Sequence, residues 1–372
     1  MFKADELYVN MGPQHPSTHG VLHLGIKTDG EIVKDVRPHI GYLHRCFEKS
    51  AEGVKYSGVI PFTDRMDYVG AIGNEWPAVL GIERLLGQEV PPRGEWIRVV
   101  AAELQRIASH LIAFGTYGID MGALTPFFWA FRERERVLDV FERMSGARLL
   151  YNYVRPGGVM RDLDPRTIEM ARAICEEMLR RLPEYDGLLT YNKIFLQRTT
   201  GVGVVSREVA LSYNLTGPNL RACGTRWDLR RDDPYSVYPE IEFDVPVGID
   251  DASLGAVKGD SWNRYRVRLL EIEQSCRIVL HALDRLPAGD SWKRPKVVKP
   301  KPGEVYARAE APRGEIGFYV IADGTDKPFR FKAKSPSFCA LSGFHAYAKD
   351  HLIADVVATL GSIDIVLGEV DR

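Results

Sequence analysis

Histidines that could donate protons or bind a ligand gather near the amino terminus of the chain. Five of the nine histidines lie within the first 44 residues, and His15, His19 and His23 recur every fourth residue. On a helix these three would share one face and could hold a metal ion, but two prolines and a glycine in the segment disfavour a helix. Three interpretations stay open: a histidine hydrogen-bonded within a tight loop, a histidine offered to a ligand, and a proton donor near neutral pH.

A group of charges with one tyrosine forms the second candidate, in the segment DRMDY at residues 64–68. The segment ends an apolar run and precedes an apolar helix. An Asp/Arg pair at a helix start would explain the charges without any function. The sequence pattern alone therefore leaves the role of Tyr68 open.

Asp120 is the third candidate, because it is the only charged residue in the apolar stretch at 111–131. A carboxylate there needs a partner, a proton or water. Two roles fit Asp120: it caps a helix or pairs with an arginine, or it has a function. Burial would raise the pKa of Asp120, and an arginine would lower it. Thr116 projects from the same side if the segment is helical there. Three glycines and Pro126 predict a helix, a buried turn and a second helix, lying in the core or at a surface that meets hydrophobic subunits.

Composition and motif spacing exclude several common chemistries. The five cysteines stand alone, so we expect free, reduced, mostly buried thiols and no zinc ribbon, self-ligated iron–sulfur centre or disulfide framework. The glycine-rich segments at 156–160 and 201–206 do not match the phosphate-binding motifs of NAD or ATP enzymes. With 49 basic and 50 acidic side chains the net charge is -1, which argues against nucleic-acid binding.

The sequence patterns of the segments that must position these residues predict an α+β fold. Its 372 residues, 45% apolar and 27% charged, are typical of a soluble globular protein. Strand signals with a Thr-Asp-Gly turn come first, helical periodicity follows, and residues 199–260 resemble loops with short strands. A Pro/Lys-rich connector at 293–304 precedes a second hairpin or meander and a last helix. We therefore expect a helical core flanked by small antiparallel β elements from both termini.

We expect the chain to form one domain and to stay in the cytosol. Its amino terminus, MFKADEL, lacks the basic start and apolar run of a secretory signal. The single domain, residues 1–372, divides into a β-rich part at 1–75, a helical core at 76–292 and a β/α part at 293–372.

Six segments, in order, resemble the D-type subunit of the bacterial proton-pumping NADH:quinone oxidoreductase, respiratory complex I. They are GPQHPSTHG, IGYLHRCFEK, DRMDY, SHLIAFGTYGIDMGALTPFFWAFRERE, YVRPGGV and DIVLGEVDR. The resemblance covers essentially the whole chain. It implies the fold of the large subunit of nickel–iron hydrogenases, whose metal is held by two Cys-x-x-Cys pairs.

This chain has none of those four thiolates. The corresponding positions hold Asp67, Gly70, Val366 and Glu369. Nickel–iron sites need soft thiolate ligands, so we expect no such metal centre and no cofactor bound by this chain itself. The resemblance implies that the vacated pocket accepts a quinone headgroup, from menaquinone or ubiquinone.

The resemblance also assigns roles to five residues. His19 and Tyr68 match the two residues that hydrogen-bond the quinone headgroup and can supply protons. Asp120 matches the carboxylate proposed to orient that histidine and to pass the charge change towards the membrane arm, and Thr116 lines the same cavity. Arg45 matches an arginine beside the terminal iron–sulfur cluster of a partner subunit.

The implied partners are the other subunits of the complex. They are the B-type subunit that bears the cluster, the C-type subunit, the ferredoxin-like I-type subunit and the H-type membrane subunit. The chain would sit peripherally on the cytoplasmic face of the bacterial membrane and be inactive alone. Two alternatives are a non-catalytic scaffold and the equivalent subunit of a ferredoxin- or reduced-deazaflavin-dependent complex.

Two positions depart from the pattern. Cys46 stands where the family usually has glycine after the arginine, so the backbone near Arg45 could be positioned differently. Leu150 stands where quinone-type members commonly have a histidine whose protonation is linked to reduction of the cluster. Its loss predicts a lower, less pH-dependent cluster potential and a low-potential quinone such as menaquinone.

Overall fold

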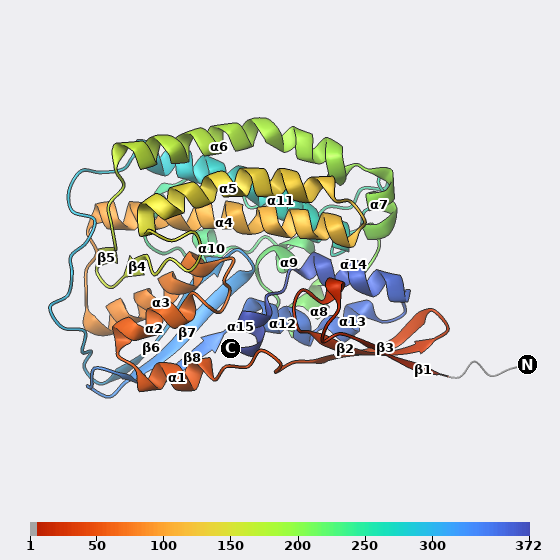
Figure 1. Ribbon diagram of the computed structural model, residues 1–372, viewed down its shortest axis with the longest axis horizontal. Coiled ribbons are helices and arrows are strands. Elements are labelled where there is room, and N and C mark those ends of the chain that lie inside the picture. The colour runs from red at the N-terminus through yellow and green to blue at the C-terminus, as the bar shows by residue number, and fades with distance from the viewer. Residues whose placement is uncertain (1–5) are drawn as a thin grey trace, which may run out of the picture.

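Four long helices form the upper layer of the molecule and two small sheets lie beneath them (Figure 1). The computed structural model describes residues 6–372, so most of the amino-terminal segment on which the signal-peptide argument rests lies outside the described residues. The long helices are α4 (Pro92–Asp120), α5 (Thr125–Ser145), α6 (Pro165–Tyr185) and α11 (Ser261–Asp284). The predicted helical core between small antiparallel sheets is confirmed.

Shorter elements fill the space between these layers. The helices are α1 (Phe47–Gly53), α2 (Tyr56–Thr63), α3 (Ala71–Leu86), α7 (Lys193–Thr199), α8 (Arg207–Ser212), α9 (Gly217–Ala222), α10 (Leu229–Asp232), α12 (Pro336–Ser342), α13 (Phe344–Ala348), α14 (Ile353–Ile363) and α15 (Leu367–Asp371), with single turns η1 (Pro16–Thr18), η2 (Asp186–Thr190) and η3 (Tyr238–Glu240). A two-stranded ribbon joins β4 (Val154–Arg155) to β5 (Gly158–Val159).

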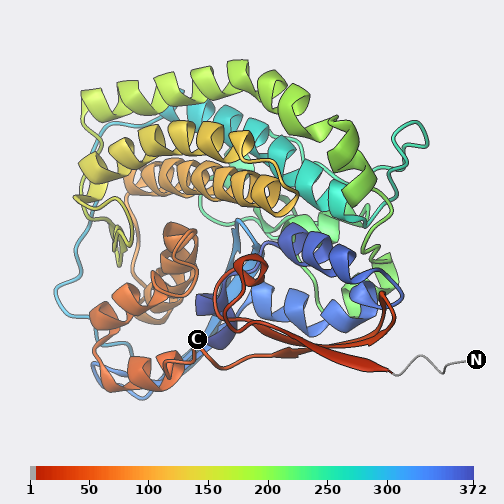
Figure 2. The ribbon, with the colours of Figure 1, turned by 45° about the vertical axis from the view of Figure 1, so that its right-hand side comes forward.

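The amino-terminal sheet holds the loop that carries His19. Strands β1 (Leu7–Met11), β2 (His23–Asp29) and β3 (Ile32–His39) pair antiparallel in sequence order. Between β1 and β2 the chain rises from the sheet towards α14, through the turn η1 (Figure 2). His15 caps this turn, because its Nδ1 accepts a hydrogen bond from the backbone N–H of Ser17 at 3.2 Å. The tight-loop interpretation therefore holds for His15.

Helix α4 runs without a break through the first part of the apolar stretch, residues 111–120, and ends at Asp120. Its last turns lie against α5, where a Cβ added to Gly115 would be 3.1 Å from Phe127 Cα. This close approach explains a glycine inside a helix. The predicted helix–turn–helix is confirmed, with the turn confined to residues 121–124.

The second sheet forms the predicted meander. Strands β6 (Gly303–Ala311), β7 (Gly314–Ala322) and β8 (Pro328–Lys334) pair antiparallel, and Pro312 and Arg313 form the tight connection between the first two. Residues 199–260 differ from the prediction. They hold the short helices α8, α9 and α10 and an isolated bridge between Asp251 and Ala256 instead of short strands.

The cysteines and the apolar stretch match their predicted environments. All five cysteines are free, and three of them are buried. Leu111, Phe114, Tyr117 and Ala130 of the apolar stretch belong to the core, but Ile119, Leu124 and Phe128 are exposed around the end of α4. No helix in the described part of the chain is long and apolar enough to cross a membrane.

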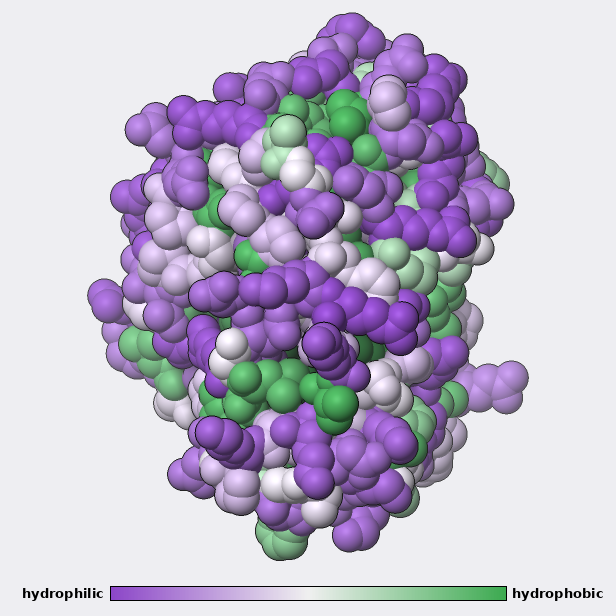
Figure 3. Space-filling model, turned by 90° about the vertical axis from the view of Figure 1, so that its left-hand side faces the viewer, coloured by the Kyte–Doolittle hydropathy of each residue, from purple (hydrophilic) through white to green (hydrophobic). Residues whose placement is uncertain are grey.

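One side of the molecule carries a basic cleft. Figure 3 views the side on which α1 and α2 lie, where hydrophilic residues cover most of the surface and apolar patches lie between them. The cleft has a volume of about 410 Å³, and Arg155, Arg294 and Lys296 are among its lining residues.

Candidate functional site

His19 and Asp120 form a hydrogen-bonded ion pair. His19 ends the turn η1 in a left-handed conformation with φ 51°, and its Nε2 lies 2.8 Å from Oδ2 of Asp120. A carboxylate at the last residue of a helix opposes the helix dipole, so Asp120 does not serve the stability of α4. Gly361 of α14 packs directly behind the pair, because an added Cβ there would be 2.7 Å from the same Oδ2.

Asp120 sets the protonation of His19. Burial disfavours the charged imidazolium, but the hydrogen bond and the charge of Asp120, together with the charge of Asp364, outweigh burial and raise the pKa of His19 above its usual value. Nε2 donates to the carboxylate, and Nδ1 makes no hydrogen bond to any residue the structure describes. Nδ1 is thus the ring atom that can offer a proton to a ligand.

Tyr68 lies in the connection between α2 and α3 and is 40% exposed. Its hydroxyl makes no hydrogen bond within residues 6–372. Burial is the largest cause that raises the pKa of Tyr68. The charge of Asp364 also raises this pKa, while the charge of Arg313 lowers it. The same two charges act on His19. His19 and Tyr68 therefore lie close to the same Arg313–Asp364 pair.

Arg313 lies beside two of the lost thiolate positions, because it pairs with Asp67 and the charge of Glu369 acts on it. It donates to Asp67 Oδ2 at 2.7 Å, to Asp364 Oδ1 at 3.0 Å and to Ser109 Oγ at 3.1 Å. Among the residues described, no three His, Cys, Asp or Glu side chains are placed to hold a metal ion. The four positions offer two carboxyls and no thiolate, so these residues do not fit a nickel–iron centre.

The two carboxyls at the lost thiolate positions, Asp67 and Glu369, have raised pKa values. Burial raises the pKa of Asp67, although Arg313 opposes this. Burial and the charge of Asp67 raise the pKa of Glu369 to about 7. The pocket therefore holds a carboxyl that titrates near neutral pH.

The Thr116 and Arg45 side chains both donate hydrogen bonds to backbone carbonyls. The Thr116 hydroxyl donates to the carbonyl of Ile112 in its own helix at 2.8 Å. Arg45 donates to the carbonyl of Arg65 at 2.7 Å, and its charge acts on Tyr68. Cys46 adopts φ 54°, a left-handed conformation that glycine adopts without strain.

A pair of buried carboxyls, Asp64 and Glu75, was missed from the sequence. Both are fully buried and lie within hydrogen-bond reach of each other. Glu75 Oε2 accepts from the backbone N–H groups of Tyr153 and Val154 at 2.8 and 2.6 Å, and Asp64 Oδ2 accepts from that of Asn152 at 2.9 Å. Within the described residues, Oδ1 of Asp64 and Oε1 of Glu75 have no other hydrogen-bond partner. Burial raises the pKa of both carboxyls, which fits a pair that shares one proton, and the pair anchors the loop before β4.

Replacing Glu75 by glutamine is expected to remove a loss of stability at high pH. Burial raises the pKa of both Asp64 and Glu75. The stability from their shared proton is thus complete below the usual carboxyl pKa and is lost as pH rises through the raised pKa, by about 1.4 kcal/mol per pH unit. The glutamine amide donates to Asp64 at every pH. Thermal unfolding of the chain at a series of pH values measures this.

The exposed Glu169→Gln is the matched control and should keep the pH dependence of the original chain. A Glu75→Gln variant with that same dependence would contradict the shared proton.

Comparison with known proteins identifies the family. The family of the respiratory-chain NADH dehydrogenase 49 Kd subunit matches residues 120–301 and 293–372. The chain is 49% identical to the D-type subunit of NADH-quinone oxidoreductase of Chlorobium luteolum, over 99% of this chain and 94% of that protein. It is 50% identical to the D-type subunit of Chlorobium chlorochromatii, over 99% and 92% of the two chains. It is also 50% identical to a D-type subunit of Cytophaga hutchinsonii, over 100% and 96%. The chain therefore belongs to the family of 49 kDa subunits of respiratory-chain NADH dehydrogenase.

Proposed function

We propose that this chain is a peripheral-arm subunit of respiratory complex I and forms the quinone-reduction site together with the subunit that bears the terminal iron–sulfur cluster. The complex would couple NADH oxidation to proton translocation. The relatives named above are NADH-quinone oxidoreductase subunits that match this chain along nearly its whole length. The observation that carries the proposal is the His19–Asp120 ion pair close to Tyr68, at a place without metal ligands among the described residues.

The two donors suit the reduction of a quinone. Two-electron reduction places negative charge on the carbonyl oxygens, and two protons must be delivered to them. Nδ1 of protonated His19 and the hydroxyl of Tyr68 are donors that no described residue engages. Asp120 keeps His19 protonated to higher pH than a free imidazole would be. Each donor therefore stabilises the developing charge and supplies one proton.

The surface around Asp120 suits a lipid-soluble substrate. Ile119, Leu124 and Phe128 are exposed beside the end of α4, although they are large apolar residues. Exposed apolar residues gathered at one place mark an interaction surface. We infer that they face the quinone tail and the H-type membrane subunit, while Arg45 faces the cluster of the B-type subunit.

The rest of the assembly follows from the same proposal. The C-type and I-type subunits would complete the contacts of the chain, which would sit peripherally on the cytoplasmic face of the membrane. Leu150, in place of a titratable histidine, favours a low-potential quinone such as menaquinone. A cluster potential that falls steeply with pH would contradict this choice.

Asp120→Asn tests the coupling between the carboxylate and His19. The amide still accepts the hydrogen bond from Nε2 but carries no charge, so the pKa of His19 should fall. The imidazolium is then lost at lower pH, and the alkaline limb of the pH–rate profile should shift to lower pH, with roughly tenfold less quinone reduction at neutral pH. The assay is quinone reduction by the assembled complex at a series of pH values.

Asp139→Asn is the matched control. Asp139 is an exposed carboxylate on α5 that pairs with Arg148 at 2.7 Å. It should leave the profile in place. If the Asp120→Asn complex keeps its rate of quinone reduction, its pH–rate profile and its proton pumping, Asp120 has only a structural role.

A further inference from the structure

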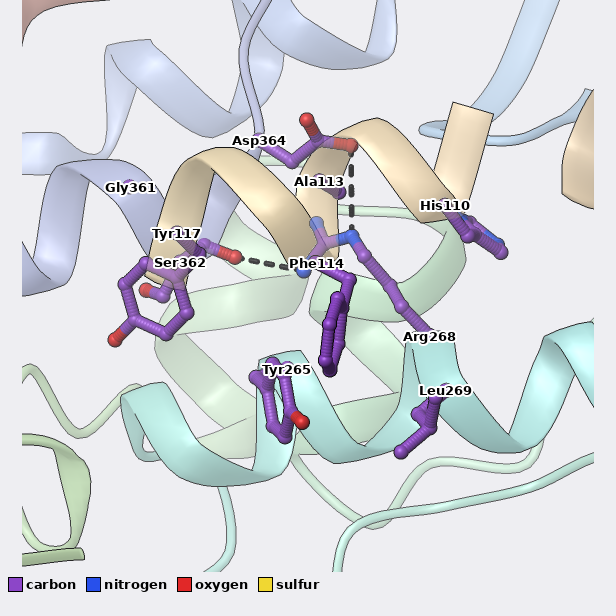
Figure 4. Close-up of a pocket in the computed structure, with 10 residues that line it drawn as sticks. All are labelled: His110, Ala113, Phe114, Tyr117, Tyr265, Arg268, Leu269, Gly361, Ser362 and Asp364. Carbon is purple, nitrogen blue, oxygen red and sulfur yellow. Dashed lines mark hydrogen bonds and ion pairs between the residues drawn. The ribbon is translucent and has the colours of Figure 1, made fainter. Parts of the chain in front are cut away.

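A small cavity lies behind the His19–Asp120 pair, between α4, α11 and the end of α14. Its volume is about 10 Å³, close to the minimum that holds one water molecule. Figure 4 shows Arg268 extending between Asp364 and Phe114, with His110 at one end of the cavity and Tyr117 at the other. Gly361 also lines the cavity and separates it from Asp120.

Four residues on the cavity wall carry buried polar atoms without a hydrogen-bond partner among the described residues. They are Nδ1 of His110, the hydroxyl oxygen of Tyr117, Nε of Arg268 and Oδ2 of Asp364. The last two atoms are 3.6 Å apart, too far for a direct hydrogen bond. Unpaired buried atoms cost free energy, and a bound water usually satisfies two to four of them. The wall therefore offers one acceptor on His110, one on Asp364, one donor on Arg268 and the hydroxyl of Tyr117.

An inner network of buried charges meets the cavity at His110. His110 Nε2 lies 2.9 Å from Glu271, and Glu271 lies 2.8 Å from Arg221. The network continues through further ion pairs with side chains that are at most 1% exposed. Its members are Arg106, Arg221, Arg230, Glu103, Asp228, Glu271 and Glu310. Three guanidiniums face four carboxyls, so the network carries one excess negative charge when every carboxyl is ionised.

An outer network meets the cavity at Asp364. Arg268 and Arg313 both pair with Asp364, and Arg313 also pairs with Asp67. The charge of Glu369 raises the pKa of Arg313, and the charge of Asp67 raises the pKa of Glu369. Glu369 is therefore the third carboxyl of this network, which has two guanidiniums. This network too carries one excess negative charge when every carboxyl is ionised. The cavity lies between the two networks.

We propose that the cavity binds water and that this water lets His110 exchange a proton with Asp364, so that His110 is a proton store behind the quinone site. The N–H bond of the His110 imidazolium breaks, the water takes that proton and gives one of its own, and an O–H bond forms on Asp364. The reverse step refills His110, and no electrons move. The role of the store rests on the proposed quinone site, while the bound water does not.

The surroundings of His110 suit a group that changes its charge. Burial lowers its pKa, as do Arg106 of α4 and Arg268 of α11, while Glu271 of α11 raises it. Arg221 of α9 and Asp364 after α14 face it across Glu271 and the cavity. With Nε2–H donated to Glu271, neutral His110 keeps a free lone pair on Nδ1. Negative charge at the quinone site favours its protonation.

His110→Gln in the assembled complex tests the store. The amide nitrogen can still donate to Glu271, but the titratable Nδ1 is lost. We expect kcat for quinone reduction to fall about tenfold with KM unchanged, and the pH profile of kcat to lose one ionisation. A purely structural change would scale the rate equally at every pH. A rate and a profile equal to those of the original complex would overturn the proposal.

His281→Gln is the matched control. His281 lies near the other end of α11 and also has an unpartnered buried nitrogen within the described residues, but it does not line the cavity. It should leave rate and profile unchanged. Should His110→Gln fail to assemble, a map of the original complex that resolves internal waters decides: density in the cavity supports the proposal and a dry cavity overturns it. If Tyr68→Phe loses activity while His110→Gln keeps it, only the proton store fails.

Discussion

Replacing Tyr68 by phenylalanine is expected to slow quinone reduction about a hundredfold while the complex still assembles. The Tyr68 hydroxyl is partly exposed and bonds to no described residue, so its loss leaves no buried partner unsatisfied and costs little stability. It does remove one of the two donors that would meet the quinone oxygens. The measurement is the rate of quinone reduction by purified complex, normalised to the amount of assembled chain.

The matched control is Tyr191→Phe, because Tyr191 is 50% exposed and bonds to nothing described through its hydroxyl. It should keep full activity. His19→Ala should lower the rate on the same scale as Tyr68→Phe, since it removes the other donor. Unchanged turnover in both assembled variants would favour the non-catalytic scaffold.

Replacing Arg313 by methionine is expected to destabilise the folded chain by about 3–5 kcal/mol. Arg313 is 3% exposed and pairs with Asp67 and Asp364, so its loss leaves the buried Asp67 without its counter-charge and leaves Asp364 with Arg268 alone. It also removes the hydrogen bond to the backbone carbonyl of Asp364 at 2.8 Å. Urea denaturation of the chain measures the change in the free energy of unfolding.

Arg148→Met is the comparison that isolates burial. Arg148 pairs with Glu135, Asp139 and Glu142, but these pairs lie on the surface of the protein. Its loss should cost less than about 1 kcal/mol. Equal costs for the two variants would mean that the charges around Arg313 are better solvated than their burial implies.

The local elements of the fold could be predicted from the sequence. Alternation and a Thr-Asp-Gly turn predict the β2–β3 hairpin, and the Pro-Arg-Gly turn predicts β6–β7. Pro126 and Gly146 mark the ends of α5. These signals act between residues that are close in the sequence, so a single chain carries them fully.

The short helices within residues 199–260 were missed for a physical reason. Ser206 and Asp228 cap α8 and α10 through side-chain hydrogen bonds, so start signals are present in the sequence. These helices have only six and four residues, too few to show helical periodicity. The glycines and prolines between them are therefore the stronger pattern.

The site could be predicted only in part. The lone carboxylate in an apolar stretch singles out Asp120, but the loop pattern leaves His15, His19 and His23 open, and only the resemblance picks His19. Nothing local predicts that His19 and Asp120 touch across 101 residues. Arg313 resembles an ordinary turn residue, yet it meets Asp67 from 246 residues away. Such contacts arise from the packing of the helical core on both sheets, and local patterns do not encode them.

The most direct test is a map of the assembled complex with a quinone, or an inhibitor that mimics its headgroup, bound. The account predicts one headgroup oxygen within hydrogen-bond distance of His19 Nδ1 and the other within the same reach of the Tyr68 hydroxyl. A headgroup bound elsewhere in an otherwise well-resolved map, with both side chains away from it, would contradict the account.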